Sequence, residues 1–310
     1  MNQAPLVEQA TRTIQAGSQS FAAATRLFDP ATRESAVLLY AWCRHCDDLI
    51  DGQALGHGQV QGDRAGAMER LASLREQTVD ACRGRPGNDP VFQGLAEVVR
   101  RHRIPADLPM EHLAGFAMDV QETHYRTLGD TLLYAWRVAG VVGVMMARVM
   151  GAERPGTLDR ACDLGLAFQL TNIARDVVED AAIGRVNLPE DWLADEGIAG
   201  LEGVLDPARR EPLARVTAPL VATAEPYYTS ALAGIGELPL RCAWSIATAR
   251  GIYRQIGRKV RLRGEHAWDA RVATSRMEKL WLVARGAAVA LAAHGIPLAS
   301  RPPGLFTRPL

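Results

Sequence analysis

Five polar side chains recur at spacings of three or four residues in the segment YAWCRHCDDLID, which covers residues 40–51. They are Tyr40, Arg44, Asp47, Asp48 and Asp51. On an α-helix these spacings place side chains on one face, and the apolar residues between them fall on the other face. The segment therefore predicts a helix with a buried side and a strongly acidic side.

A second acidic cluster lies far along the chain, in the segment FQLTNIARDVVED at residues 168–180. Its polar stripe consists of Gln169, Asn172, Arg175, Asp176, Glu179 and Asp180. Leucine, isoleucine and valine occupy the opposite side at helical spacing. The two clusters are built alike.

Two interpretations compete for these clusters. Either stripe could be the solvated side of an ordinary amphipathic helix. However, Asp47 and Asp51 stand at i and i+4, as do Asp176 and Asp180, and such like-charge pairs cost a helix about 0.2–0.5 kcal/mol each. A bound cation removes that cost, and all-oxygen ligand sets are typical of Mg²⁺ or Mn²⁺.

Paired acidic helices in a helical protein suggest chemistry on a diphosphate. A diphosphate leaves an allylic carbon only when its developing negative charge is neutralised, which metal ions and arginine donors can do. The carbocation left behind would react with water, so the rest of the site must be apolar and closed. We therefore expect a metal-dependent site inside a helical bundle.

Cys43 and Cys46 form a CxxC within the first acidic segment, a spacing that also occurs in zinc and redox sites. No second CxxC follows, the pair falls within an expected helix, and no βαβ pattern surrounds it. We therefore expect neither a zinc site nor a redox site here.

Helical periodicity runs through almost the whole sequence, and alternating strand patterns are rare. We expect an all-α fold in a single domain over residues 1–310, with a short irregular tail at about 299–310. Segment 281–294 could contact a membrane surface, but we expect it to pack in the core. The expected helices cover about residues 6–15, 20–27, 32–50, 65–83, 90–102, 110–123, 130–150, 157–181, 211–234, 241–263 and 275–294, with loops between them, including 184–210.

The composition excludes several classes of protein. The 310 residues are 48% hydrophobic and 23% charged, with 35 basic and 35 acidic side chains, which excludes disorder and argues against a nucleic-acid partner. Five cysteines favour a reducing compartment. No signal sequence and no run of about 18 apolar residues is found. We expect a cytoplasmic protein, either free or peripheral on the inner face of the cell membrane.

With these segments in view, the sequence resembles the squalene/phytoene synthase family, and within it the bacterial phytoene-forming branch. The segment at 168–180 carries most of the resemblance, because chain-elongating prenyltransferases and terpene cyclases share the pattern DDLID. The matching segments are GSQSF at 17–21, YAWCRHCDDLID at 40–51, YAWRVAGVVG at 134–143, LGLAFQLTNIARDVVEDAAIGRVNLP at 164–189 and ARGIYRQIGRKV at 249–260.

The resemblance implies a bundle of the isoprenoid synthase type around a central cavity, with two aspartate-rich helices that hold Mg²⁺ or Mn²⁺. It implies a prenyltransferase of carotenoid biosynthesis that condenses two geranylgeranyl diphosphates head to head, through a cyclopropylcarbinyl (prephytoene) diphosphate, to phytoene. The reaction ends by proton loss, so no NADPH is expected. Other carotenoid enzymes and a membrane surface are conceivable partners.

The resemblance also assigns roles to individual positions. Metal binding falls on Asp47, Asp48, Asp51, Asn172, Asp176, Glu179 and Asp180. Substrate binding falls on Ser18, Ser20, Tyr40, Arg44, Gln169, Arg175, Tyr253 and Arg271. The residues expected to be catalytic are Asp47, Asp51, Asp176, Asp180, Tyr40 and Arg44.

Simpler roles remain open for some of these residues. Arg44 and Arg175 could be intrahelical partners of Asp48 and Glu179, and Ser18 and Ser20 could be helix N-caps. Tyr40, Tyr134 and Tyr253 could be core tyrosines, while Gly140 and Gly143 should let helices approach closely.

Three other functions share part of this pattern. A thirty-carbon squalene or dehydrosqualene synthase would have the same acidic helices. A head-to-tail prenyltransferase or terpene cyclase would need a different second motif. A non-catalytic assembly protein of the same ancestry would not need both acidic clusters complete, as they are here.

The small residues after Ser20 generate a prediction on substrate length. If Ala22 or Thr25 lines the pocket for the isoprenoid tail, replacement by Phe should depress use of the twenty-carbon diphosphate and spare the fifteen-carbon one, because the added bulk blocks the last unit. If these residues only pack against other helices, both activities and the Tm should fall together. Assays with both substrates, with melting curves, decide between the two outcomes.

Overall fold

The computed structural model describes residues 7, 8, 10, 11, 25–51, 64–296 and 298–309, with the backbone alone for Asp51, Arg64 and Ala65. Within these residues every regular element is a helix, which confirms the expected all-α fold. Ser18, Ser20 and Ala22 lie outside the described residues. Thr25 is described, and its side chain is buried.

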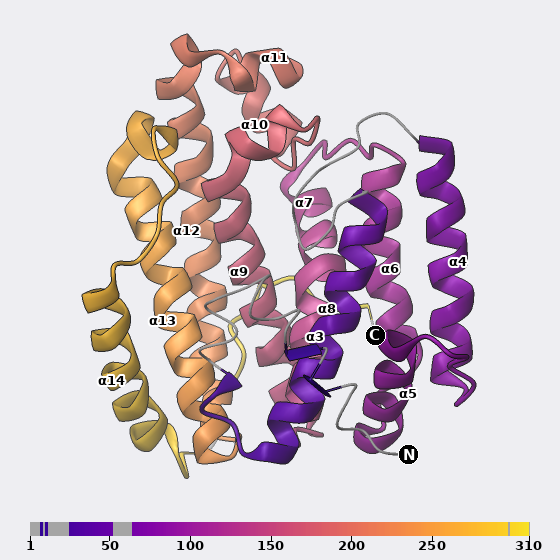
Figure 1. Ribbon diagram of the computed structural model, residues 1–310. Helices are drawn as coiled ribbons and strands as arrows, with labels where there is room; N and C mark the ends of the chain where they lie inside the picture. Colours follow the sequence, from indigo (N-terminus) through magenta and orange to yellow (C-terminus); the bar gives the residue numbers. More distant parts are fainter. Residues whose placement is uncertain (1–6, 9, 12–24, 52–63, 297, 310) are drawn as a thin grey trace.

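The helices follow the predicted periodicity closely (Figure 1). Their bounds in chain order are α3 (Pro30–Asp51), α4 (Arg64–Cys82), α5 (Pro90–His102), α6 (Asp107–Val120), α7 (Leu128–Ala135), the π-helix η1 (Trp136–Gly140), α8 (Val141–Val149), α9 (Pro155–Ala182), α10 (Glu190–Asp195), α11 (Gly200–Leu205), η2 (Pro207–Arg209), α12 (Arg210–Ile235), α13 (Leu240–Arg263), η3 (Gly264–Trp268) and α14 (Arg276–Ala293).

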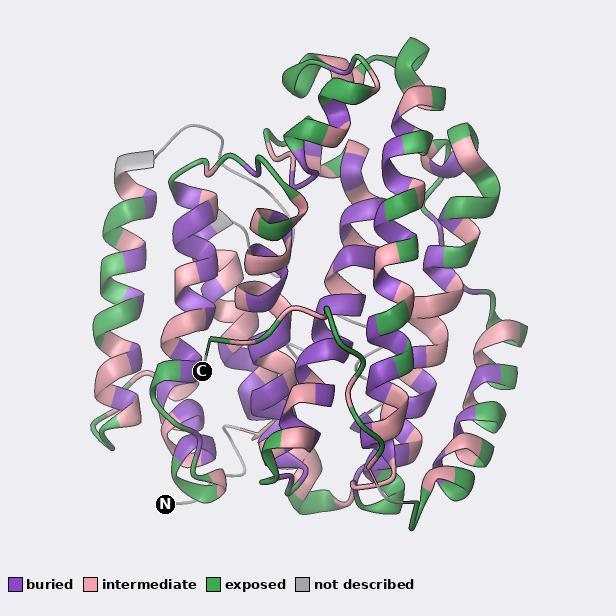
Figure 2. Ribbon diagram, turned by 180° about the vertical axis from the view of Figure 1, so that it is seen from behind, coloured by how far each residue is buried: buried purple, intermediate pink, exposed green. Residues whose placement is uncertain are grey.

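Helix α9 lies in the middle of the bundle (Figure 1). It packs against α12, α13 and α8, while α3 packs against α5, α4 and α8 on the other side. The short helices α10 and α11 lie together at one end of the molecule, and α14 lies on its outer edge. Figure 2 shows that the buried residues face inward from all the long helices.

Two glycines allow α9 to contact the η1–α8 segment through backbone. A Cβ on Gly165 would lie 2.3 Å from the carbonyl oxygen of Ala139, and a Cβ on Gly143 would lie 2.5 Å from that of Ala161. Real Cβ atoms do not approach an oxygen so closely, so any side chain at these positions would push the helices apart. The expectation that Gly143 serves close packing is confirmed.

The most apolar helical run within the described residues is Leu128–Val149. It is long and apolar enough to cross a membrane by length and composition, but 56% of its most apolar window is buried inside the bundle. The apolar character of this run is thus accounted for by packing in the core.

The irregular tail after α14 is fixed to the back of the bundle, where Figure 2 shows it crossing the helices. Arg301 donates two hydrogen bonds to the fully buried carboxylate of Asp163 on α9, at 3.0 and 2.5 Å. Arg308 bonds Asp159 at 2.6 Å, and the Phe306 amide donates to the Tyr227 hydroxyl at 3.0 Å. The tail thus carries a charge that a buried acid of the core requires.

The structure differs from the sequence expectation in two places. The segment at 184–210, expected as loop, contains α10, α11 and η2. The expectation that segment 281–294 packs in the core is wrong for most of its residues. Only Leu282, Gly286 and Ala290 of α14 are buried, whereas Trp281 is 61% exposed.

We predict that Gly165→Ala destabilises the bundle. The added methyl group must displace the Ala139 carbonyl, and overpacking of this kind costs about 1–3 kcal/mol, or a few degrees in Tm. Gly129→Ala is the matched control, because it also adds a methyl to a helical glycine but meets only the Thr127 hydroxyl at 3.4 Å. The control should be neutral or slightly stabilising, and equal melting temperatures for the two variants would contradict the backbone-contact argument.

Candidate active site

Helices α3 and α9 present their acidic faces to one cavity of about 460 Å³. Residues from α7, from the loop after α9 and from the segment after η3 complete its wall. Among the described residues, its lining consists of Arg44, Asp47, Tyr134, Gln169, Asn172, Ile173, Asp176, Asp180, Arg185, Asn187 and Arg271. The two clusters that the sequence separates by more than a hundred residues therefore face each other in space.

On α3, Arg44 holds two carboxylates at once. Its guanidinium bonds Asp47 at 2.8 Å and Asp48 at 2.6 Å. The expected intrahelical pair between Arg44 and Asp48 is thus present. Asp47 lines the cavity and its side chain is 37% exposed, whereas the side chain of Asp48 is 16% exposed and lies behind Arg44.

On α9, Asp176 is the centre of a second ion-pair group. The Arg175 guanidinium donates to both of its carboxylate oxygens, from Nε at 2.7 Å and from a second nitrogen. Arg271 approaches the same carboxylate at 3.2 Å and bonds Glu179 at 2.5 Å. The alternative pairing of Arg175 with Glu179 as its main partner is not found; the closer neighbour Asp176 takes that place.

Asp180 lies one helical turn beyond Asp176 on the same wall of the cavity. Its burial raises the pKa of this carboxyl to about 7, and the negative charge of Asp176 adds to the effect. The nearby Arg185 acts in the opposite direction and does not cancel the shift. Near neutral pH, Asp180 is therefore divided between the acid and the carboxylate form.

Tyr40 and Tyr253 lie beside the cavity and connect its two sides. The Tyr253 ring stacks on Phe168 of α9, with ring centres 4.2 Å apart. Burial raises the pKa of both phenols, and each lies within electrostatic range of the other and of a cluster arginine. Both hydroxyls therefore remain protonated and can act as hydrogen-bond donors.

The described residues fit a hard cation in chemistry but do not form a finished cage. Asn172 Oδ1 is buried without a hydrogen-bond partner, which is costly unless a ligand satisfies it. It lines the cavity with Asp47, Asp176 and Asp180, an oxygen donor set suited to Mg²⁺. Within the described side chains, which exclude that of Asp51, no three acidic, histidine or cysteine groups are close enough to hold an ion. Arginines are paired with Asp47 and Asp176 in this structure.

Cys43 and Cys46 do not behave as reactive thiols. Burial raises the pKa of Cys43 to about 12 and that of Cys46 well above its ordinary value. Both cysteines are free and lie within α3. Thiols of this kind are poor nucleophiles and poor metal ligands.

Seven of the predicted site residues line the cavity, and the others fall beside it or outside the described part. Arg44, Asp47, Gln169, Asn172, Asp176, Asp180 and Arg271 are in the lining. Tyr40, Asp48, Arg175, Glu179 and Tyr253 contact lining residues or lie within their electrostatic range. Asp51 lies at the end of α3, with only its backbone described.

Four lining residues were not assigned to the site from the sequence: Tyr134, Ile173, Arg185 and Asn187. Tyr134 was interpreted as a core tyrosine, and it is in fact buried and donates to Asp119 at 3.4 Å. Arg185 and Asn187 follow Gly184, whose φ of +89° ends α9 and reverses the chain. The Arg185 amide then bonds back to the Asp180 carbonyl at 2.9 Å. In the sequence, the signal for this turn is Gly184 itself, because a glycine directly after a helix commonly ends it and reverses the chain.

Comparison with known proteins gives one consistent result. The family model described as "Squalene/phytoene synthase" matches residues 14–278. The phytoene synthase of Pseudescherichia vulneris is 50% identical over 310 residues, the full length of both chains. The 15-cis-phytoene synthase of Enterobacter agglomerans is 52% identical over 297 residues, 96% of this chain and 100% of that one. The solved structure of a dehydrosqualene synthase with a ligand superposes with a TM-score of 0.81 at 27% identity, covering 93% of this chain and 98% of the other.

We predict that Asp180→Asn stabilises the metal-free protein at alkaline pH. Because the folded-state pKa lies near 7 and the ordinary value is 3.8, the folded state loses stability as pH rises from about 4 to 7. The amide avoids that loss, so at pH 8 the variant should gain about 1–3 kcal/mol, seen as a Tm higher by a few degrees. At pH 4 the two proteins should melt alike.

Added Mg²⁺ provides the control for this prediction. A cation at the cavity stabilises the Asp180 carboxylate, so Mg²⁺ should raise the Tm of the unchanged protein more than that of Asp180→Asn. A variant that is less stable than the unchanged protein at pH 8 without metal would show that the surroundings do not destabilise the charged form of Asp180.

Proposed function

The chain belongs to the squalene/phytoene synthase family, and from this membership we propose that it condenses two molecules of geranylgeranyl diphosphate head to head to phytoene. It is an enzyme, a transferase of prenyl groups. The reaction passes through prephytoene diphosphate, releases diphosphate and serves carotenoid biosynthesis. The observation that carries the proposal is the cavity at which Asp47 of α3 meets Asn172, Asp176 and Asp180 of α9.

Arginines supply the positive charge that a diphosphate requires. Arg44, Arg185 and Arg271 line the cavity from three separate segments, so their donors converge from several sides. In this structure Arg44 and Arg271 are paired with Asp47 and Asp176. On substrate binding we expect these guanidiniums to turn to phosphate oxygens, for which their planar donor geometry is well suited.

The acidic residues hold the cations that accompany the substrate. Asp47, Asp176, Asp180 and the amide oxygen of Asn172 form the set that would bind Mg²⁺, with Asp51 following on α3. Mg²⁺ held by these residues would supply positive charge to offset the charge that develops on the leaving diphosphate. Because the pKa of Asp180 is raised toward neutrality, this carboxyl would have to lose its proton before it could coordinate a cation.

The wall of the cavity also has an apolar part. Ile173 and the buried Tyr134 contribute apolar surface next to the charged groups, and the stacked rings of Phe168 and Tyr253 lie alongside. Since Tyr40 and Tyr253 stay protonated, they can donate hydrogen bonds to an anionic leaving group without removing a proton from the carbocation.

The thirty-carbon reaction is the second candidate, because a dehydrosqualene synthase has the same fold at 27% identity. The relatives that are 50% and 52% identical along the chain are named phytoene synthases. We therefore propose the twenty-carbon diphosphate as the substrate. Nothing in the proposed chemistry uses a reductant, so NADPH should not be needed.

We predict that Asp47→Asn and Asp176→Asn each lower turnover of geranylgeranyl diphosphate by at least about a hundredfold while the fold survives. Each change keeps the shape of the side chain and removes one charge from the metal site. The assay measures phytoene in the organic extract at saturating Mg²⁺, with and without NADPH, and with farnesyl diphosphate as the competing substrate.

Asp195→Asn is the matched control, because Asp195 is exposed at the end of α10, away from the cavity lining. It should keep full activity. Near-normal turnover by either site variant would contradict the proposal that the replaced aspartate binds the metal. A main product that requires NADPH or farnesyl diphosphate would replace the proposed reaction with the thirty-carbon one.

A further inference from the structure

The outer side of α14 is apolar, which is the reverse of an ordinary surface helix. Its residues Met277, Leu280, Trp281, Ala284, Ala288 and Leu291 are all exposed and recur at spacings of one, three or four. We call them the α14 outer face. The buried row of Leu282, Gly286 and Ala290 lies about half a turn away and packs on α13. The polar side of a surface helix normally lies opposite its buried row.

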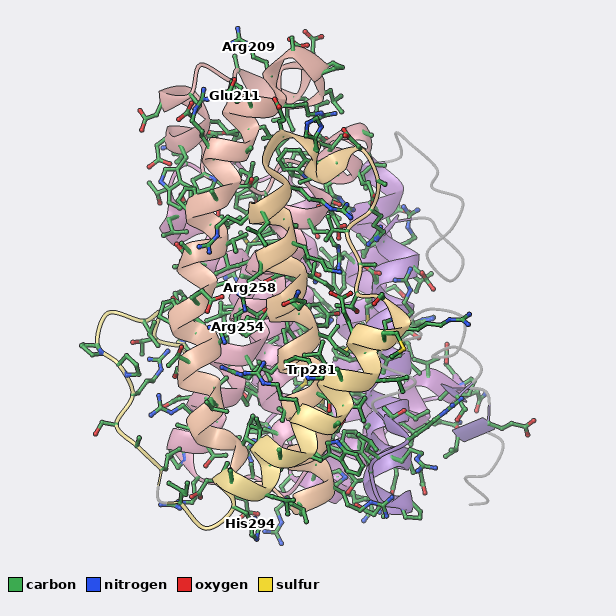
Figure 3. The ribbon with its side chains drawn as sticks, turned by 90° about the vertical axis from the view of Figure 1, so that its left-hand side faces the viewer. Arg209, Glu211, Arg254, Arg258, Trp281 and His294 are labelled. Atoms are coloured by element: carbon green, nitrogen blue, oxygen red, sulfur yellow. The ribbon has the colours of Figure 1, made fainter. Side chains whose placement is uncertain are left out.

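The exposure of this face is large. Met277 is 74% exposed, Leu280 64%, Trp281 61% and Leu291 64%. Large apolar side chains gathered on one exposed stripe mark a surface that binds something. Figure 3 views the molecule from this side, with α14 running across the front and Trp281 labelled.

The charges that border the face are positive. Arg276 and Arg285 are exposed on its two edges, and the Arg285 guanidinium lies 5.3 Å from the centre of the Trp281 ring. Glu278, the only acid in the helix, is already engaged: it accepts from Lys259 at 2.6 Å and caps the helix through Ser275. The face therefore combines apolar side chains with a basic rim that is not neutralised from within the helix.

This combination selects among the possible occupants. A second copy of the chain would bring Arg276 and Arg285 toward the same two arginines, without an acid of α14 to pair with them. A surface of anionic lipids offers both an apolar layer for the leucines and tryptophan and phosphate groups for the arginines. Tryptophan and arginine are also typical of the boundary between headgroups and acyl chains.

We propose that the α14 outer face docks the protein on the surface of a membrane rich in anionic lipids. The helix lies in the plane of the interface, with Leu280 and Trp281 inserted between headgroups. The catalytic cavity is formed by other helices, so docking does not require residues of the active site. The inference does not rest on the proposed reaction.

The test is sedimentation of the full chain with sucrose-loaded vesicles, either of phosphatidylcholine alone or of phosphatidylcholine mixed with phosphatidylglycerol. The protein should sediment with the anionic vesicles, more weakly at high salt. The double variant Leu280→Ser/Trp281→Ser keeps the charge but removes two inserted side chains. Its partition coefficient should fall at least about tenfold, which corresponds to a loss of about 1.4 kcal/mol for the two side chains together.

Further variants separate the contributions. Arg276→Gln/Arg285→Gln should weaken binding chiefly at low salt. Met68→Ser/Leu201→Ser is the matched control, because it removes two exposed apolar side chains of α4 and α11 and should bind as the unchanged protein does. Ala284→Glu/Ala288→Glu keeps good helix formers and should abolish binding through charge repulsion, which covers the case in which the serine variant unfolds.

Two results would overturn the proposal. One is an unchanged protein that does not sediment with anionic vesicles, or a set of α14 variants that bind as well as it does. The other is a dimer in solution that Leu280→Ser/Trp281→Ser converts to a monomer, which would assign the face to a second copy. Because the assay contains no substrate, either result leaves the proposed reaction untouched.

Discussion

Negative charge concentrated at one cavity is the constraint on which the rest of the structure depends. Asp47, Asp176 and Asp180 share its wall, and like charges that line one cavity repel one another where they are partly shielded from water. The fold tolerates them because arginines from α3, from α9 and from the segment after η3 compensate the charge. Burial raises the pKa of Asp180, the charge of Asp176 adds to the effect, and the nearby arginines do not cancel it.

Other features of the bundle serve to keep these charges in place. The backbone contact at Gly143 and Gly165 fixes α9 against α8, so its acidic stripe cannot turn away from the cavity. The positive φ of Gly184 returns Arg185 to the same wall. The acids thus lie on rigid helices. Two of the arginines, Arg185 after α9 and Arg271 after η3, lie outside the helices and can change partners without movement of the bundle.

The sequence predicts which side chains share a face of one helix better than it predicts how separate segments come together. Spacings of three and four residues determine which side chains share a helix face, so the sequence predicts the two acidic faces that α3 and α9 present to the cavity. Arg185 and Asn187 were missed because the path of a loop after a turn is not encoded in periodicity. The catalytic, substrate-binding and metal-binding roles of the individual site residues remain predictions, and Ser18 and Ser20 lie outside the described residues.

Helix α14 shows a second limit of periodicity. It has apolar residues on both its inner and its outer stripe, and the pattern alone does not say which stripe is buried. The decision depends on size, because Gly286 has no side chain to keep α14 away from α13: a Cβ there would lie 2.3 Å from the Thr248 hydroxyl. Gly286 and Ala290 therefore face inward beside Leu282, and Leu280, Trp281 and Leu291 are left outside.

The contact between Arg301 and Asp163 has a consequence for the order of folding. Asp163 is fully buried in α9, and the guanidinium that bonds both of its carboxylate oxygens stands 138 residues further along, after α14. Arg160 of the same helix lies within electrostatic range of Asp163, but its guanidinium donates to Ser230 and to the carbonyl of Ala299. Until the segment after α14 packs against the bundle, the Asp163 carboxylate therefore lacks its two hydrogen bonds from Arg301. Tight packing around this part of α9 thus requires a contact between segments distant in sequence, which forms more slowly than the helices themselves.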